Sequence, residues 1–96
     1  MPEYKLAPKA REDLESIWIY SMKHWELNQT ERYIDDLIAA FRFLAKSPKA
    51  GIACDNIRRG YRKHPVMRHF IYYRETSYGV EVIRILHDRM LAARYF

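Results

Sequence analysis

Apolar side chains in the first half of the chain recur at intervals of three and four residues, which is the spacing of one face of an α-helix. The first stripe predicts a helix over residues 8–25, with Pro8 at a tolerated first position. The alternating residues 3–6 just before it predict a short strand. The stripe follows Ala10, Leu14, Ile17, Ser21 and Trp25.

A second stripe predicts another helix over residues 28–46. Asn28 followed by Glu31 is similar to a capping box and sets the predicted start, while Ser47 before Pro48 blocks continuation. A short connection between two amphipathic helices favours an antiparallel helical hairpin. The stripe follows Tyr33, Leu37, Ala40, Phe41 and Leu44.

After residue 60 the period of the apolar positions changes to two, which is typical of strands. Pro65 is expected to end the first strand, because proline cannot donate to a sheet ladder. Gly79 supplies a permissive backbone for a hairpin turn. The expected segments are a loop over 49–56, strands over 61–64, 67–74 and 80–87, a turn over 76–79 and a short helix over 89–96.

This order of elements predicts an α+β fold. An N-terminal strand and a helical hairpin precede a three-stranded antiparallel meander and a short C-terminal helix, so the helices should cover one face of the sheet. At 96 residues the chain is expected to be one domain, residues 1–96. The order of the strands within the sheet stays open at this point.

Alternation along the strands mixes apolar and cationic side chains on both faces. In the strand over 67–74, Arg68, Phe70, Tyr72 and Arg74 share one face. Along 80–87 the same rule groups Glu81, Ile83, Ile85 and His87 on one face, and Val80, Val82, Arg84 and Leu86 on the other. We therefore expect the helices to cover one face, and the other to form a partly apolar, cationic groove holding Arg68 and Arg84.

The net charge of +5 is placed unevenly. Residues 57–96 hold nine basic and three acidic side chains, a net +6, whereas residues 9–46 hold six basic and seven acidic ones, a net −1. Such a surplus favours nucleic acid or an acidic protein segment as partner. The alternative is that the positive charge serves solubility alone.

The sequence offers little support for cofactor or metal chemistry. The spacing of the histidines His24, His64, His69 and His87 matches no zinc signature, and neither a nucleophile motif nor a phosphate-binding glycine loop is present. No apolar run approaches the length of a membrane span, and the single Cys54 suits a reducing cytoplasm. One catalytic possibility stays open, a cluster of Arg68, Arg84 and His87 for acid–base cleavage of RNA.

Five segments in fixed order resemble the ParE branch of the RelE/ParE toxins of bacterial type II toxin–antitoxin systems. The more specific ones lie in residues 68–74, Arg-His-Phe-Ile-Tyr-Tyr-Arg, and in residues 80–90, which end in Ile-Leu-His-Asp-Arg-Met. The other matching segments are residues 4–14, 29–33 and 44–48. Together they span almost the whole chain, and the resemblance implies the same order of elements.

The resemblance implies a toxin that binds DNA gyrase and blocks replication without chemistry of its own. It also implies a cognate ParD-like antitoxin, with a ribbon-helix-helix part that holds the complex on operator DNA and a flexible tail that folds across the toxin. The alternative is a RelE-like, ribosome-dependent messenger RNA endoribonuclease that uses Arg68, Arg84 and His87. The residues expected to contact antitoxin or target are Arg59, Arg62, Arg68, Tyr72, Arg74, Arg84, His87 and Arg89.

Overall fold

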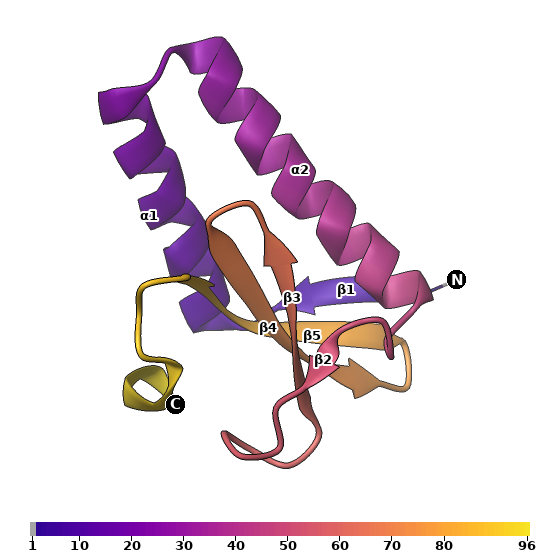
Figure 1. The fold of residues 1–96 in the computed structure, drawn as a ribbon. Coiled ribbons are helices and arrows are strands. Elements are labelled where there is room, and N and C mark those ends of the chain that lie inside the picture. Colours follow the sequence, from indigo (N-terminus) through magenta and orange to yellow (C-terminus); the bar gives the residue numbers. More distant parts are fainter. Residues whose placement is uncertain (1) are drawn as a thin grey trace.

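The computed structural model describes residues 2–96 and has the α+β architecture expected from the sequence (Figure 1). The elements follow one another as β1 (Glu3–Leu6), α1 (Pro8–His24), α2 (Leu27–Lys46), β2 (Ile52–Ala53), β3 (Tyr61–Val66), β4 (His69–Thr76), β5 (Gly79–His87) and the 3₁₀ turn η1 (Ala92–Tyr95). The helical hairpin, the N-terminal strand and the antiparallel meander are confirmed. No helix in this part of the chain has the length and apolar character needed to cross a membrane.

The five strands form one sheet in the order β1-β5-β4-β3-β2. The N-terminal strand β1 pairs with the last strand β5 in parallel, and β3, β4 and β5 pair in antiparallel fashion. Gly79 opens β5 with a φ of 146°, and a Cβ atom there would stand 2.0 Å from the carbonyl oxygen of Glu3. Glycine at this position therefore permits the close approach of β1 to β5.

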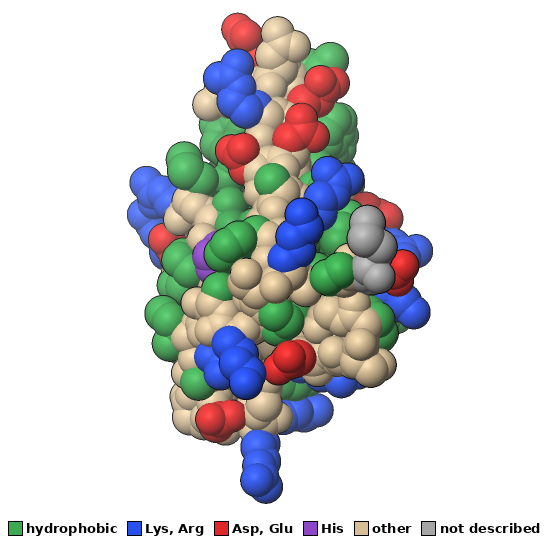
Figure 2. Space-filling view, turned by 90° about the vertical axis from the view of Figure 1, so that its right-hand side faces the viewer, with side chains coloured by type: hydrophobic (Ala, Val, Ile, Leu, Met, Phe, Trp, Pro, Cys, Tyr) green, Lys and Arg blue, Asp and Glu red, His purple; other side chains and the backbone are tan. Residues whose placement is uncertain are grey.

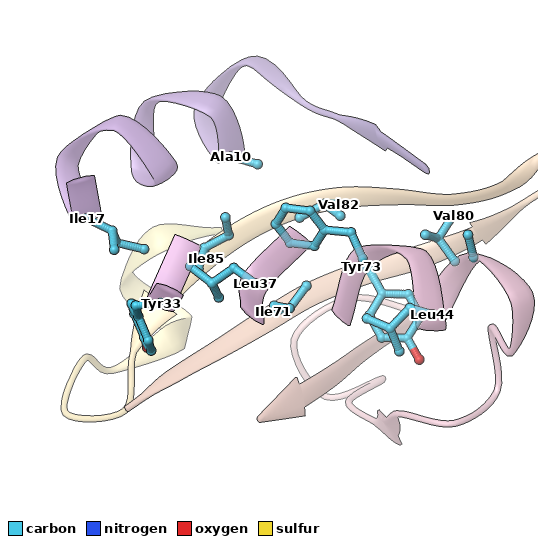
Figure 3. Packing of buried hydrophobic residues seen from close by; sticks show 12 residues of the cluster. Ala10, Ile17, Tyr33, Leu37, Leu44, Ile71, Tyr73, Val80, Val82 and Ile85 are labelled. Carbon is cyan, nitrogen blue, oxygen red and sulfur yellow. The ribbon is translucent and has the colours of Figure 1, made fainter. Parts of the chain in front are cut away.

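The main core lies between the helical hairpin and one face of the sheet (Figure 3). Each helix contributes the apolar stripe recognised in the sequence, and the sheet contributes side chains from β4 and β5. The cluster consists of Ala10, Ile17, Tyr33, Leu37, Phe41, Leu44, Ala45, Ile71, Tyr73, Val80, Val82 and Ile85. Burial of these side chains provides the main apolar contribution to folding.

A second, smaller core lies on the opposite face of the sheet. Cys54, Tyr61, Tyr72 and Leu86 are buried there, and Phe96 and Ala92 from the C-terminal segment pack against them. The expected open cationic groove on this face is therefore wrong, because the loop around Cys54 and the end of the chain cover it.

A β-bulge in β5 explains why the strand faces differ from the expected alternation. Tyr72 pairs with Arg84 but the next residue, Tyr73, pairs with Val82, so Ile83 is an extra residue in the ladder. The extra residue shifts the alternation by one position. The core clusters accordingly hold Val80, Val82 and Ile85 on the helix side and Ile83 and Leu86 on the other.

Several predicted boundaries differ from the structure for local reasons. The second helix begins at Leu27 after Glu26, so the predicted cap at Asn28 is wrong. Pro65 does not end β3 but pairs with Phe70 of β4. Proline is tolerated at this position because β2 no longer lies on the other side of β3. Residues 52–53, expected in a loop, form the short edge strand β2.

The hairpin between β3 and β4 is tighter than predicted. Met67 and Arg68, expected as the start of a strand, form a two-residue turn, and β4 begins at His69. The expected C-terminal helix is a single 3₁₀ turn over Ala92–Tyr95.

The hydroxyl of Tyr73 anchors the loop that leads from α2 into the sheet. It accepts a hydrogen bond from the backbone N–H of Gly51 and donates one to the carbonyl of Pro48, each over 2.8 Å. A Cβ atom on Gly51 would lie 2.4 Å from this hydroxyl, so only glycine fits. Burial also raises the pKa of Tyr73.

Replacing Tyr73 with phenylalanine should therefore destabilise the fold. Loss of the two hydrogen bonds leaves a buried N–H unpaired and should lower the free energy of unfolding by about 1–3 kcal/mol. Urea unfolding measures this change. Tyr20→Phe is the matched control, because Tyr20 is 62% exposed, and should change it by less than about 0.5 kcal/mol. Equal effects of the two variants would contradict the anchoring role.

Candidate partner-binding groove

An open groove of about 860 Å³ lies between the two helices, the β3–β4 turn and the end of β5. Figure 1 shows the β3–β4 turn extending toward the helical hairpin formed by α1 and α2. The groove walls combine aromatic, methionine and charged side chains. Among them are Tyr20, Trp25, Tyr33, Met67, Arg68, His69, His87, Arg89 and Met90.

Apolar side chains on the groove walls are unusually accessible. Tyr20 is 62% exposed, Met67 77% and Met90 44%, and Trp25 packs edge-on against Tyr33 with 39% of its own surface exposed. Exposed large apolar groups that gather in one place are typical of interaction surfaces. The groove thus has the character of a docking site for another chain.

The floor of the groove is a hydrogen-bonded aromatic cluster. The Tyr33 hydroxyl lies 3.1 Å from the Val66 carbonyl and 2.5 Å from Nδ1 of His69. A hydroxyl has one proton, so both contacts are satisfied when it donates to Val66 and accepts from Nδ1–H of His69. Burial, with a further contribution from His87, lowers the pKa of His69 to about 4. His69 is therefore neutral at pH 7.

The rim of the groove is cationic. Arg68 and Arg89 are exposed, and among residues 2–96 neither guanidinium group forms a hydrogen bond or an ion pair. The backbone N–H of Asp88 donates to the carbonyl of Arg68 over 2.8 Å, which holds the two segments side by side. His87 stacks edge-on against His69, and its contact with Asp88 is an ion pair only when the ring is protonated.

Arg84, a predicted site residue, is engaged in the fold and does not line the groove. Its guanidinium group binds both carboxylate oxygens of Asp13, at 2.8 and 2.9 Å, and donates to the carbonyl of Tyr95 at 3.1 Å. The carboxylate also accepts the backbone N–H of Ile85. The hydrogen bond to Asp13 raises the pKa of Arg84. Of the possible nuclease cluster, Arg68 and His87 share the groove but Arg84 does not.

The other predicted contact residues lie outside the groove. Arg62 donates to the carbonyl of Gly51, Arg74 pairs with Glu81 at 2.8 Å, and Tyr72 is 4% exposed within the second core. Arg59 is exposed in the loop before β3. The structure therefore brings together Arg68, His87 and Arg89 from the predicted set, and leaves Arg59, Arg62, Tyr72, Arg74 and Arg84 elsewhere.

On the side shown in Figure 2, positive charge does not form a single patch, because basic, acidic and apolar side chains are interspersed there. The groove adds residues that the sequence did not name as site candidates, notably Tyr20, Trp25, Met67 and Met90. Trp25 was assigned to the core-facing stripe of the first helix, and nothing in the local pattern distinguishes an exposed aromatic or methionine side chain from a buried one. Among residues 2–96 no group of three or more His, Cys, Asp or Glu side chains is arranged to hold a metal ion.

Comparison with known proteins agrees with this architecture. A family model described as ParE toxin of type II toxin-antitoxin system, parDE, matches residues 4–92. Toxin ParE1 of Mycobacterium tuberculosis, from strains CDC 1551 / Oshkosh and H37Rv, is 42% identical over 88 residues that cover 91% of this chain and 90% of the relative. Toxin ParE1 of Caulobacter vibrioides is 37% identical over 92 residues, which are 96% of this chain and 95% of that toxin.

A solved structure titled chromosomal ParDE TA system from P. aeruginosa shares the fold, with a TM-score of 0.76 and 17% identity over 91% of this chain and 96% of that one. The fold is thus α+β, and the family model and the relatives place the chain among the small toxins of type II toxin–antitoxin systems. The chain belongs to the ParE toxin family. Membership implies an antitoxin partner.

The Asp13–Arg84 contact should couple the two residues energetically. Both side chains are mostly buried, at 15% and 14% exposure, so a double-mutant cycle with Asp13→Asn and Arg84→Met should give a coupling of about 1–3 kcal/mol in the free energy of unfolding. The control cycle uses Glu81→Gln and Arg74→Met at the more exposed pair, where about 0–1 kcal/mol is expected. A coupling near zero for the first pair would contradict its structural role.

The low pKa of His69 should make stability fall in weak acid. The folded-state pKa is about 4 and the ordinary value is 6.5, so the unfolded chain binds the proton more readily between these values. The stabilisation is complete above about pH 6.5 and is lost as pH falls toward 4, by about 1–3 kcal/mol. Urea unfolding at pH 7.5 and pH 5 measures it. His69→Gln should reduce this pH dependence, and an unchanged dependence would refute the assignment.

Proposed function

We propose that this toxin inhibits DNA gyrase by binding, and that a cognate ParD-like antitoxin neutralises it. In this proposal residues 1–96 act as one toxin domain, and the complex reaches operator DNA through the antitoxin. The observation that carries the proposal is the groove, in which accessible apolar walls meet two arginines, Arg68 and Arg89, that have no partner among residues 2–96. Such a surface suits macromolecular contact.

The groove suits the flexible tail of the antitoxin. Apolar side chains of a tail would bury against Tyr20 and Trp25, and its carboxylates would meet Arg68 and Arg89 in two-point contacts. Ordering a flexible segment costs about 2–5 kcal/mol, so the apolar anchors must outweigh that cost. The exposed surface of Tyr20, Trp25 and Met90 offers such anchors.

The geometry favours binding over the alternative of RNA cleavage. The nuclease hypothesis requires Arg84 beside a scissile phosphate. The guanidinium group of Arg84, however, already binds Asp13 and the Tyr95 carbonyl. His69, the more buried histidine of the groove, has a pKa of about 4, so it is not an imidazolium acid at pH 7, and its Nδ1–H is already directed at the Tyr33 hydroxyl. A purely binding mode of inhibition requires neither group to act as acid or base.

The direct experiment is a supercoiling assay with purified toxin and gyrase. Supercoiling should fall with toxin concentration and recover when the cognate antitoxin is added first. Messenger RNA in translating ribosomes should stay uncut, as transcript-end sequencing would show. Uninhibited supercoiling at large toxin excess would refute gyrase as the target, and new 5′ ends would favour the nuclease.

Charge reversal tests the use of the rim arginines. The double variant Arg68→Glu with Arg89→Glu should weaken binding of an antitoxin-tail peptide by about 10–100-fold, because carboxylates lose their partners and meet like charge. Calorimetry or fluorescence anisotropy measures the affinity. The control Arg11→Glu with Arg42→Glu changes the net charge equally at exposed positions outside the groove. Equal loss in both double variants would point to net charge rather than to the groove.

A further inference from the structure

Met67 occupies a backbone conformation that its side chain disfavours. Its φ is 54°, and it is the one residue other than glycine with positive φ among residues 2–96. The left-handed region is unfavourable for an L-residue, because the Cβ atom comes too close to the following carbonyl oxygen. The other two positive φ values, at Gly60 and Gly79, fall on glycines. The chain thus uses glycine at two such positions and methionine at the third.

The fold itself gives no reason for methionine at this position. The side chain is 77% exposed, more than any other large apolar side chain in the described part of the chain, and it belongs to neither core cluster. A two-residue hairpin turn prefers asparagine or glycine. A strained residue that contributes little to packing is a reason to look for a role in function.

Met67 stands in an accessible apolar and cationic surface. Arg68 follows it in the turn, and the hydrogen bond from the N–H of Asp88 to the Arg68 carbonyl brings the segment after β5 alongside. In that segment Met90 is 44% exposed and Leu91 63%. We call Met67, Arg68, Arg89, Met90 and Leu91 the turn patch.

We propose that the turn patch is the surface by which the toxin binds its target. Met67 inserts as an apolar anchor into a pocket of a folded partner, and that partner carries carboxylates around the pocket. The inference rests on the proposed function for the identity of this partner, gyrase. The strained turn presents the methionine, and Arg68 and Arg89 supply the charge that selects an acidic surround.

Shape assigns the Met67 tip of the turn patch to a folded target and the aromatic groove walls to the antitoxin tail, while Arg68, Arg89 and Met90 border both surfaces. A flexible tail binds by lying in a concave surface, which Tyr20, Trp25 and Tyr33 provide. A two-residue turn tip is convex and requires a concavity on the partner. Methionine is suited to such insertion, because its unbranched, polarisable side chain adapts to irregular pockets.

The test compares three variants in the supercoiling assay. Met67→Gly removes the anchor and relieves the backbone strain, while Met67→Gln keeps the backbone demand and makes the side chain polar. Met22→Gln is the matched control, since Met22 is 41% exposed on α1 and does not line the groove. We expect half-inhibition to need at least about 10-fold more toxin for both Met67 variants, and a change below about twofold for the control.

Thermal unfolding separates the role of the side chain from that of the fold. Met67→Gly should melt at or above the wild-type temperature while losing inhibition, because glycine accepts the positive φ. Wild-type inhibition by either folded Met67 variant would overturn the inference. So would a loss of affinity for the antitoxin with unchanged inhibition of gyrase, which would make Met67 an antitoxin contact.

Growth arrest on induction distinguishes this inference from the proposed function. If the wild-type toxin arrests growth but leaves gyrase supercoiling intact, gyrase is not the target and the proposed function fails. The same variants then test the anchor against the unknown target. Full arrest by Met67→Gln, expressed at wild-type level, would overturn the turn patch in that case as well, and loss of arrest would support it.

Discussion

Burial of one sheet face beneath the helical hairpin is the constraint on which the rest of this structure depends. The apolar stripes of both helices pack against the same sheet face, formed by Ile71 and Tyr73 of β4 and by Val80, Val82 and Ile85 of β5. Toward one end, Leu37, Phe41 and Leu44 of α2 fill the space between the helices and the sheet. Toward the other end the walls stay open, and the groove lies there.

A single polar contact completes the sheet where the N-terminal strand ends. β1 pairs with β5 only as far as Leu6 and Val82, so the later N–H of Ile85 needs another acceptor, and the carboxylate of Asp13 supplies it. The same carboxylate binds Arg84, whose guanidinium group reaches the C-terminal segment as well. Helix, sheet and chain end are thereby joined, and Arg84 serves the architecture while Arg68 and Arg89 stay available to partners.

Large apolar side chains exposed to water favour unwanted association unless a partner covers them, and an antitoxin is such a partner. Tyr20, Met67 and Leu91 are each more than half exposed. A surface of this kind favours association. In our proposals the aromatic groove walls serve the antitoxin and the Met67 tip serves the target, and Arg68, Arg89 and Met90 lie where the two surfaces overlap.

The sequence by itself determined both helices, the strands β1, β3, β4 and β5 and the order of these elements, because periods of 3.6 and 2 are local properties of a chain that must bury one side of each element. It also identified Arg68, His87 and Arg89 as site candidates. It did not determine β2 or the 3₁₀ form of the C-terminal turn. Only the tertiary structure decided which side chains meet. The bulge at Ile83 shifts the alternation by one residue, and Arg84 finds its partner in Asp13, 71 positions earlier. Trp25, Tyr33 and Met67 likewise share one groove although they lie on separate elements. Such pairings depend on register and packing between distant segments, which no local pattern contains.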